Sequence, residues 1–347
     1  MVALPFRDWR RALRRLSLRV IYRAPGERED CPACGSHDLF DLDVLQLRAG
    51  RTGFVCGCDA CGLVFSNPLP SPDHLAEFCS PTGQWAVSHH NDRQPRPTDT
   101  RVGGTWARIF DPIRDEVDVT APRPGASVLD FGCGEGNLLD LFQNCGWQTW
   151  GIEPAVDRAF QRHRRLDAVP ATPTFDLILA ILVLEHVANP LQLLRQFAGA
   201  CRVGGHVLIS VPRFDTLPDH RDYRYVLNGR AHITAYTSAC LRTLLARAGW
   251  EAVGFWPDDI GKRGGGRRTT IRMRALARRV DRPLPEAESP GEAARATVRG
   301  YYARADSRAL ISRMGFLRIA ARRASVERRR AKGAKGARQS TVPGSSA

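Results

Sequence analysis

The sequence of 347 residues predicts an α/β protein in three parts: a small cysteine-bearing module, a sheet of mainly parallel strands covered by helices, and a helical, basic C-terminal extension. Two cysteine pairs between residues 31 and 61 mark the first part. Over residues 126–280, strand-like apolar runs alternate with amphipathic stretches of helical period, which is typical of a helix-covered parallel sheet. The first of these runs ends in a glycine-rich turn, as expected of a first β-strand that leads into a ligand-binding loop.

Residues 1–30 are expected to form a basic amphipathic helix. Arginines surround one apolar face, which carries Phe6, Trp9, Leu13, Leu16 and Val20. Such a face packs on its own protein or on a second subunit, or it lies on an anionic membrane. The net charge of +15 belongs to the two ends of the chain, so peripheral membrane contact through these ends stays open.

Residues 31–70 are expected to form a zinc ribbon. The two C-x-x-C pairs supply the predicted metal ligands Cys31, Cys34, Cys58 and Cys61. A glycine follows each pair and lets two successive amides point at the thiolates, as in a zinc knuckle. Four sulfur ligands make a closed structural site for Zn²⁺ rather than a catalytic one. Alternatively, one pair holds no metal and packs as small apolar side chains, and Cys56 is an extra cysteine whose spacing fits no knuckle.

The elements that follow are expected in this order. Residues 71–125 are a connector rich in Pro, Asp and Thr, with one helix near 105–118. Strands are expected at 127–131, 149–153, 175–180, 205–211 and 251–255, with 269–277 as a last strand. Helices are expected at about 136–146, 155–165, 190–201 and 237–248. Residues 281–327 continue as a helical extension, and 328–347 form a disordered basic tail that cannot bury a core.

The glycine loop lies in VLDFGCGEGNLL, residues 128–139. Its glycines are spaced G-x-G-x-G, which differs from the dinucleotide fingerprint, and no Lys-Ser/Thr follows, which excludes a P-loop. Asp130 precedes the glycines and Glu135 lies among them, which disfavours a pyrophosphate. Carboxylates suit a ligand with an ammonium and a sulfonium, such as S-adenosylmethionine. Glu153 closes the next strand, where a carboxylate accepts hydrogen bonds from ribose hydroxyls.

Taken in order, VLDFGCGEGNLL, GIEP, FDLILAILVLEHV and CRVGGHVLISVP resemble the motifs of class I S-adenosylmethionine-dependent methyltransferases over residues 126–257. The resemblance implies a Rossmann-like α/β sheet, S-adenosylmethionine as cofactor and methyl transfer as the reaction. By this resemblance the methionine part is wrapped by Asp130, Phe131, Gly132, Cys133, Gly134 and Gly136. Glu153 then holds the ribose, and the sulfonium is bordered by Ala180, Ile181 and Leu182. The stretch CGLVFSNP resembles the zinc ribbon that precedes many bacterial small-molecule and sugar-modifying methyltransferases.

One segment departs from the family pattern. Between Glu153 and the strand that begins at Phe175, the family fits a helix, a third strand and an acidic residue beside the adenine. Here only LDAVPATPT, residues 166–174, follows the expected helix, and Asp167 comes early for that acidic role. The third strand is therefore very short, or the adenine pocket is open.

Two histidines are candidate general bases for methyl transfer. His186 in LEHV follows the strand at 175–180, and His232 follows a loop that covers the site. The alternatives are structural roles: His186 hydrogen-bonded to backbone, and His232 as part of the covering loop. Tyr223 and Tyr225 of that loop shape the acceptor pocket or only pack.

The expected acceptor is a hydroxyl, amine or carbon of a small molecule, sugar or glycan precursor. The tetrapeptide [DN]-P-P-[YF], which in this superfamily marks methylation of exocyclic amines, is missing after the strand at 175–180, where ILVLEH stands. A second hypothesis is an RNA methyltransferase whose ribbon and basic ends bind phosphates, and a third is a cofactor-binding protein without turnover. The cysteine usage predicts reduced thiols and a cytoplasmic location.

Overall fold

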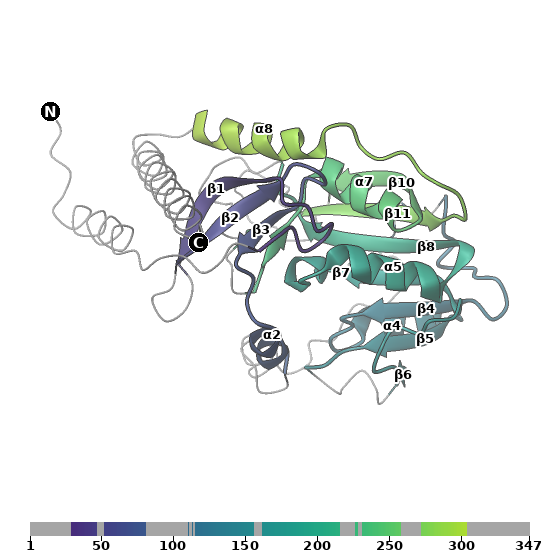
Figure 1. Cartoon of the computed structure of the whole chain (residues 1–347). Coiled ribbons are helices and arrows are strands. Elements are labelled where there is room, and N and C mark those ends of the chain that lie inside the picture. The colour runs from purple at the N-terminus through teal and green to yellow at the C-terminus, as the bar shows by residue number, and fades with distance from the viewer. Residues whose placement is uncertain are drawn as a thin grey trace, which may run out of the picture. The chain divides into compact units, whose positions relative to one another are not determined.

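The computed structural model describes residues 29–46, 52–80, 110, 113, 115–155, 162–215, 226–227, 231–257 and 272–303 (Figure 1). The chain divides into two compact units, and the unit of residues 24–299 holds nearly all of the described elements. The other unit, residues 1–23 and 300–347, is described only at 300–303. The predicted N-terminal helix, Tyr223, Tyr225, the extension beyond 303 and the basic tail lie outside the described residues.

The main sheet confirms the predicted α/β fold, and it is mixed. Its seven strands follow the order β10-β11-β8-β7-β4-β5-β6. Five of them are parallel: β4 (Ser127–Phe131), β5 (Gln148–Ile152), β6 (Arg164–Arg165), β7 (Phe175–Ile181) and β8 (Cys201–Pro212). At one edge, β11 (Arg272–Arg279) pairs antiparallel with β8, and β10 (Trp250–Pro257) pairs antiparallel with β11. The strand order reverses between β4 and β7, because β5 and β6 lie on one side of β4 and β7 and β8 on the other. Open α/β sheets bind ligands at the carboxyl ends of the strands at such a point.

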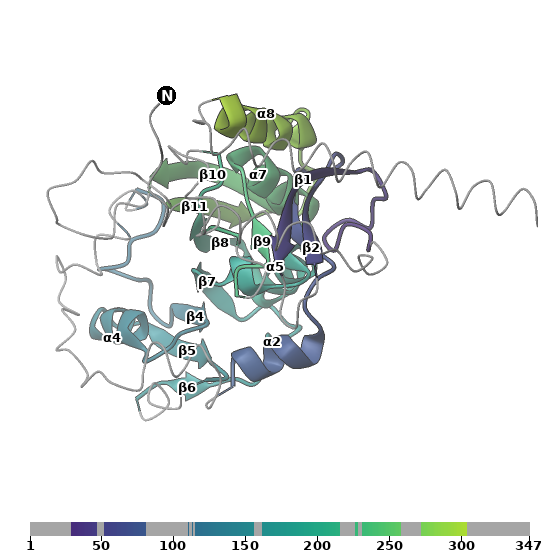
Figure 2. The same cartoon turned by 90° about the vertical axis from the view of Figure 1, so that its left-hand side faces the viewer.

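Helices cover both faces of this sheet. α4 (Asn137–Asn144) follows β4, and α5 (Pro190–Ala200) and α7 (Ser238–Arg247) cover the opposite face, as Figure 2 shows. The connection from β4 to β5 and the connection from β7 to β8 run toward opposite sides of the sheet. Because both crossovers are right-handed, their helices lie on opposite faces. Local signals begin the helices, since the Asn189 side chain accepts a hydrogen bond from Gln192 N ahead of Pro190, and Thr237 caps α7.

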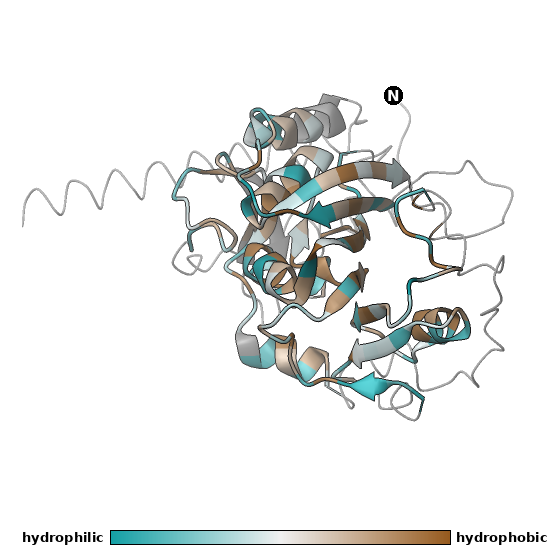
Figure 3. Cartoon of the chain, turned by 90° about the vertical axis from the view of Figure 1, so that its right-hand side faces the viewer, coloured by the Kyte–Doolittle hydropathy of each residue, from teal (hydrophilic) through white to brown (hydrophobic). Residues whose placement is uncertain are grey.

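The core lies between the central strands and these helices. Figure 3 shows hydrophobic residues on the central strands and a hydrophilic β6 at the sheet edge. Phe142 of α4 is fully buried and packs edge-on against Trp147, and the Trp147 indole donates to Val119 O at 2.9 Å. Burial of each large apolar side chain contributes about 1.5–3 kcal/mol to stability. None of the helices in the described part of the chain is both long and apolar enough to cross a membrane.

Two predicted helices differ from the structure. The helix expected at 155–165 is wrong at its end, because residues 164–165 form β6, which pairs with β5. Burial of His163, which bonds to Thr149 and Asp140, brings the chain back to the sheet edge there. The third strand of the family pattern is therefore present but has only two residues, which confirms the first of the two expectations for this segment. The helix near 105–118 does not reach its predicted end, since residues 115–118 are turn and coil.

A second sheet is built from the cysteine module. Its order is β1 (Leu39–Gln46), β2 (Thr52–Cys58), β3 (Val64–Asn67) and β9 (Thr234–Ala235), all antiparallel. The last strand, β9, comes from the α/β part of the chain and pairs with β3, so this sheet combines strands of both parts. The short helix α2 (Pro72–Phe78) follows this module, and α8 (Pro290–Ala303) is the described helix of the predicted extension.

Candidate functional site

The glycine loop connects β4 to α4 in a backbone conformation that requires glycine. Gly132, Gly134 and Gly136 have φ angles of 79°, 53° and 80°, which other residues adopt only with strain. A Cβ on Gly132 would lie 2.6 Å from Val183 Cγ2, so the loop touches the segment that follows β7. The carboxyl ends of β4 and β7 thus meet at the point where the strand order reverses.

The amides of the glycine loop are occupied by the protein itself. Gly132 N and Cys133 N donate to Ile152 O at 2.8 and 3.2 Å, and Gly134 N donates to Glu153 Oε2 at 2.9 Å. A phosphate cradle needs several amides that point together at the anion. These three amides point at the end of β5 instead, which agrees with the predicted exclusion of a P-loop.

Two buried carboxylates flank the loop. Glu153 is 6% exposed, and its second oxygen accepts from Ala155 N at 2.8 Å, so backbone amides hold both carboxylate oxygens at the end of β5. Asp130 is 2% exposed, and burial, followed by the nearby Glu153 charge, raises the pKa of Asp130 to about 7. Within the described part of the chain, no basic side chain forms an ion pair with Asp130. The two buried carboxyl groups therefore favour a cationic ligand at this end of the sheet.

The end of β7 supplies the predicted sulfonium border. Ala180 is buried, and Leu182 follows the strand with φ 59°, an uncommon conformation for leucine. The Leu182 amide donates to Ser210 O at 2.8 Å, and this bond holds the turn. Ile181 lies between them, so all three residues stand at the same sheet edge as the glycine loop.

Two other residues of the predicted cofactor set have packing contacts. The Phe131 ring lies edge-on to Phe197 of α5, with ring centroids 5.4 Å apart. Cys133 is 8% exposed, and burial raises the pKa of its thiol, which is therefore not a reactive thiolate. Their backbone shapes the loop, and their side chains hold it to the core.

The structure brings the two candidate histidines together. His186 ends the short helix η4 (Leu184–His186) after β7, and the centroids of the His186 and His232 rings are 5.0 Å apart. His186 Nδ1 lies 2.8 Å from Ala231 O; since a carbonyl only accepts, Nδ1 carries the proton and Nε2 is the acceptor nitrogen in neutral His186. This bond is the backbone contact that the structural alternative expects, and it also sets the tautomer that a general base needs.

Sequence analysis missed two residues beside this pair. Phe78, at the end of α2, stacks on His186 with ring centroids 6.4 Å apart. Glu185 is 1% exposed, and burial raises its pKa to about 8, partly opposed by a backbone hydrogen bond and by the charge of Arg272. The possible ligand atoms of Glu185, His186 and His232 lie within 4.8 Å of one another, so this group can share a proton or hold a cation. Glu185 could have been found from the sequence, because it is adjacent to His186 in LEHV. No sequence pattern pointed to Phe78.

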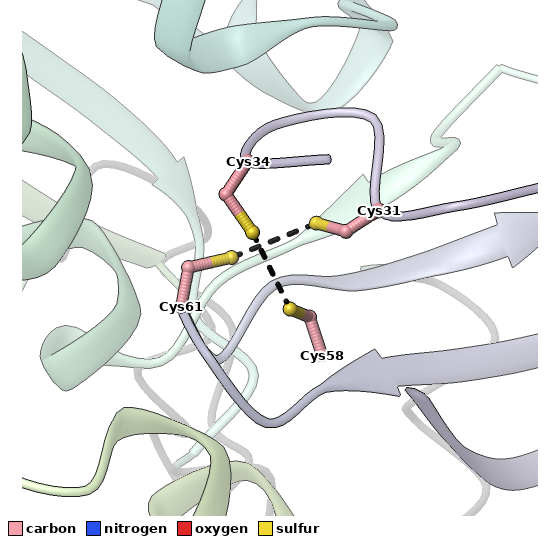
Figure 4. Close-up of side chains that lie close together, drawn as sticks. All are labelled: Cys31, Cys34, Cys58 and Cys61. Atoms are coloured by element: carbon pink, nitrogen blue, oxygen red, sulfur yellow. Dashed lines mark hydrogen bonds between the residues drawn. The ribbon is translucent and has the colours of Figure 1, made fainter. Parts of the chain in front are cut away.

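The four predicted metal ligands also lie together (Figure 4). Cys31 Sγ is 3.7 Å from Cys61 Sγ, and Cys34 Sγ is 3.5 Å from Cys58 Sγ. A tetrahedral site with Zn–S bonds of about 2.3 Å places its sulfurs about 3.8 Å apart, close to these distances. The side chains are buried except for the half-buried Cys34, so the residues fit a closed zinc site.

The knuckle geometry supports the same assignment. Gly35 and Gly62 have positive φ angles, and their amides donate to Cys31 O and Cys58 O at 2.8 and 2.9 Å. These bonds form the two tight turns that the sequence predicted. Cys56, the extra cysteine, is buried in β2 and does not belong to the group of four.

The knuckles pack on the rest of the protein. Arg247 of α7 donates to Ala60 O at 3.0 Å, and Arg295 of α8 donates to Asp59 Oδ1 at 2.9 Å. The Arg295 guanidinium also lies over the Phe40 ring, 3.8 Å from its centroid. The charged Asp59 and the aromatic Phe40 of the module are thus both in contact with Arg295 of the same chain.

Comparisons with known proteins agree with this geometry. Residues 105–254 match a family model described as a methyltransferase domain. A ubiquinone biosynthesis O-methyltransferase of Xanthomonas campestris pv. campestris is 30% identical over 118 residues, which are 29% of this chain and 49% of that protein. An uncharacterized 37.1 kDa protein in transposon TN4556 of Streptomyces fradiae is 28% identical over 136 residues, 34% of this chain and 39% of that protein. The chain thus spans less than half the length of these relatives.

Solved structures are similar at low identity. A Burkholderia thailandensis 1,6-didemethyltoxoflavin-N1-methyltransferase covers 69% of this chain and 100% of its own, at 17% identity and TM-score 0.46. An S-adenosylmethionine-dependent methyltransferase from Mesorhizobium loti covers 51% of this chain and 100% of its own, at 18% identity and TM-score 0.40. The family match confirms the predicted enzyme class at the level of the domain, since residues 105–254 of this chain match a methyltransferase domain.

Proposed function

We propose that this protein transfers a methyl group from S-adenosylmethionine to a hydroxyl, amine or carbon of a small molecule, sugar or glycan precursor. The observation that carries the proposal is the buried acidic pair, Asp130 and Glu153, beside a glycine loop whose amides are already occupied. Curated relatives named as ubiquinone biosynthesis O-methyltransferases support a small-molecule acceptor.

The cofactor would lie across the carboxyl ends of β4, β5 and β7. Glu153 accepts the ribose hydroxyls, Asp130 attracts the ammonium, and Ala180–Leu182 border the sulfonium. S-adenosylmethionine, when bound, supplies a methyl group already activated by its sulfonium. The protein then has to align the acceptor and remove its proton.

Asp167 is proposed to face the adenine, contrary to the expectation that it comes too early. The structure ends β6 at Arg165, so Asp167 follows its strand by two residues, at the sheet edge that carries Asp130 and Glu153. Its side chain is 91% exposed and accepts from Arg165 Nε at 3.3 Å, and a carboxylate can accept a further hydrogen bond from a ligand amine. A very short third strand thus still places an acidic residue at the carboxyl end of the sheet.

Proton removal is proposed for the histidine pair. His232 is the general base, and His186, with Nδ1 held by Ala231 O, presents Nε2 as an acceptor beside it. Glu185 has a possible ligand atom within 4.8 Å of those of both histidines, so this buried carboxyl group can exchange a proton with either ring. The Phe78 ring forms an apolar wall next to His186.

The cysteine site is proposed to hold one structural Zn²⁺. The described part of the ribbon argues against the RNA hypothesis, because Arg295 occupies both Asp59 and Phe40 from within the chain. An RNA-binding ribbon needs exposed basic and aromatic side chains on its surface. Contact of the basic ends with membranes or nucleic acid concerns residues outside the described part, and it stays a prediction.

The proposal is tested with radiolabelled S-adenosylmethionine and fractionated cell extract. We expect label in small solutes or in sugar-containing precursors. Label that enters RNA and depends on salt concentration would favour the RNA hypothesis instead. Tight binding of S-adenosylhomocysteine without turnover on any fraction would favour the cofactor-binding protein.

A further inference from the structure

We propose that the cysteine module is a clamp that positions the two histidines of the methyltransferase site, through the pairing of β3 with β9. The inference rests on the proposed role of His186 and His232. It adds a function to the module: its metal site would organise the acceptor half of the active site and leave the cofactor half unaffected.

The first step runs from the cysteines to β3. Cys58 ends β2, and its amide donates to Leu63 O at 2.9 Å, directly before β3 begins at Val64. Cys61 lies in the turn between the two strands. The sulfur cluster therefore closes the turn that fixes the position of β3.

The second step runs from β3 to β9. Val64 is paired with Ala235 and Phe65 with Thr234. The Ser66 amide donates to Ile233 O at 3.0 Å, and its hydroxyl lies 3.4 Å from the same oxygen. The two-residue strand β9 is too short to be stable by itself, so it depends on this partner.

The third step runs from β9 to the histidines. The Ile233 amide donates to Glu185 O at 2.8 Å, and the Ala231 carbonyl accepts from His186 Nδ1. The Thr234 and Tyr236 hydroxyls both lie within 3.0 Å of Leu184 O. Residues 231–236, which include His232, are thus hydrogen-bonded to β3 on one side and to η4 on the other.

The cofactor half is built differently. Asp130 lies on β4, and the glycine loop and Glu153 directly follow β4 and β5, which pair with each other and with β7 and β6. Neither strand pairs with β3 or β9. Loss of the clamp should therefore release residues 231–236 and spare the binding of S-adenosylhomocysteine.

The test measures amide hydrogen exchange of the full chain, with S-adenosylhomocysteine affinity measured in parallel. Ser66→Pro removes the amide that bonds to Ile233, while Ser66→Ala keeps it and is the matched control. Cys34→Ser removes a metal ligand, and Cys145→Ser makes the same chemical change outside the cluster. We expect faster exchange at 231–236 in Ser66→Pro and Cys34→Ser only, unchanged exchange at 127–153, and unchanged affinity for S-adenosylhomocysteine.

Turnover, once an acceptor is known, should fall about 100-fold or more in the same two variants, the usual contribution of a general base. Unchanged exchange at 231–236 in both variants would overturn the clamp. So would faster exchange that includes 127–153 with loss of S-adenosylhomocysteine binding, because the module would then be a general stabiliser. Since exchange is measured without an acceptor, failure of the proposed reaction would be seen separately.

Discussion

Asp130→Asn should make the unliganded protein more stable and its cofactor binding weaker. The side chain is 2% exposed, and its pKa rises from the ordinary 3.8 to about 7 because of burial and the charge of Glu153. A difference of this size corresponds to about 4 kcal/mol, which is the cost of ionising Asp130 in the folded state. Asparagine has nearly the same shape and carries no charge, so it avoids that cost.

The sign of the pH dependence follows from proton binding. Between pH 3.8 and about 7 the folded protein holds a proton on Asp130 that the unfolded chain releases, so stability falls as pH rises and is constant above pH 7. The free energy of unfolding of Asp130→Asn relative to the parent should therefore rise by about 3 kcal/mol from pH 5 to pH 8.

Urea denaturation at several pH values measures this difference, and calorimetry measures the affinity for S-adenosylhomocysteine. The parent should bind S-adenosylhomocysteine more tightly as pH rises through 7, since only ionised Asp130 attracts the ammonium, and Asp130→Asn should show a flatter profile. A stability difference that does not change between pH 5 and pH 8 would refute the reasoning. The same holds for Asp130→Asn binding S-adenosylhomocysteine as tightly as the parent at pH 8.

Four further predictions concern the site and the module. His232→Ala should lower kcat about 100-fold or more with unchanged affinity for S-adenosylhomocysteine, and full turnover would exclude His232 as the base. Gly132→Ala should lower the free energy of unfolding by about 2–4 kcal/mol, because its φ is positive and the new Cβ overlaps Val183; denaturation with wild-type stability would contradict this. Asp167→Ala should raise the Kd for S-adenosylhomocysteine about tenfold, the value of a hydrogen bond to a charged group, and an unchanged Kd would remove Asp167 from the adenine site. Native mass spectrometry should find one zinc ion per chain, whose removal by a chelator lowers Tm; a chain without zinc would disprove the site.

The sequence predicts the parts of the fold that local patterns encode. The strands β4, β5 and β7 are apolar runs, and Asp130 and Glu153 stand at strand ends, so their meeting at one sheet edge follows from parallel topology. The cysteine site is predictable for a similar reason, because each knuckle is a local motif. Its four sulfurs come together through the pairing of β1 with β2, which places Leu39, just after the first knuckle, opposite Cys58 of the second.

Other features depend on contacts that leave no local pattern. The two-residue strand β9 pairs with β3 across about half of the sequence, and nothing in Thr234–Ala235 marks it. The burial that shifts the pKa of Glu185 and the stacking of Phe78 on His186 arise from tertiary packing. The predicted helix at 155–165 is wrong at its end because the buried hydrogen bonds of His163 outweigh the helical periodicity of this segment.

The most direct test of the cationic-ligand site is a calorimetric titration at pH 8 with S-adenosylhomocysteine, ATP and NAD, each against the parent and Glu153→Gln. We predict that the parent binds S-adenosylhomocysteine and neither nucleotide, and that Glu153→Gln weakens this binding. Binding of ATP or NAD by the parent, or equal binding of S-adenosylhomocysteine by both proteins, would contradict an acidic site for a positively charged methyl donor.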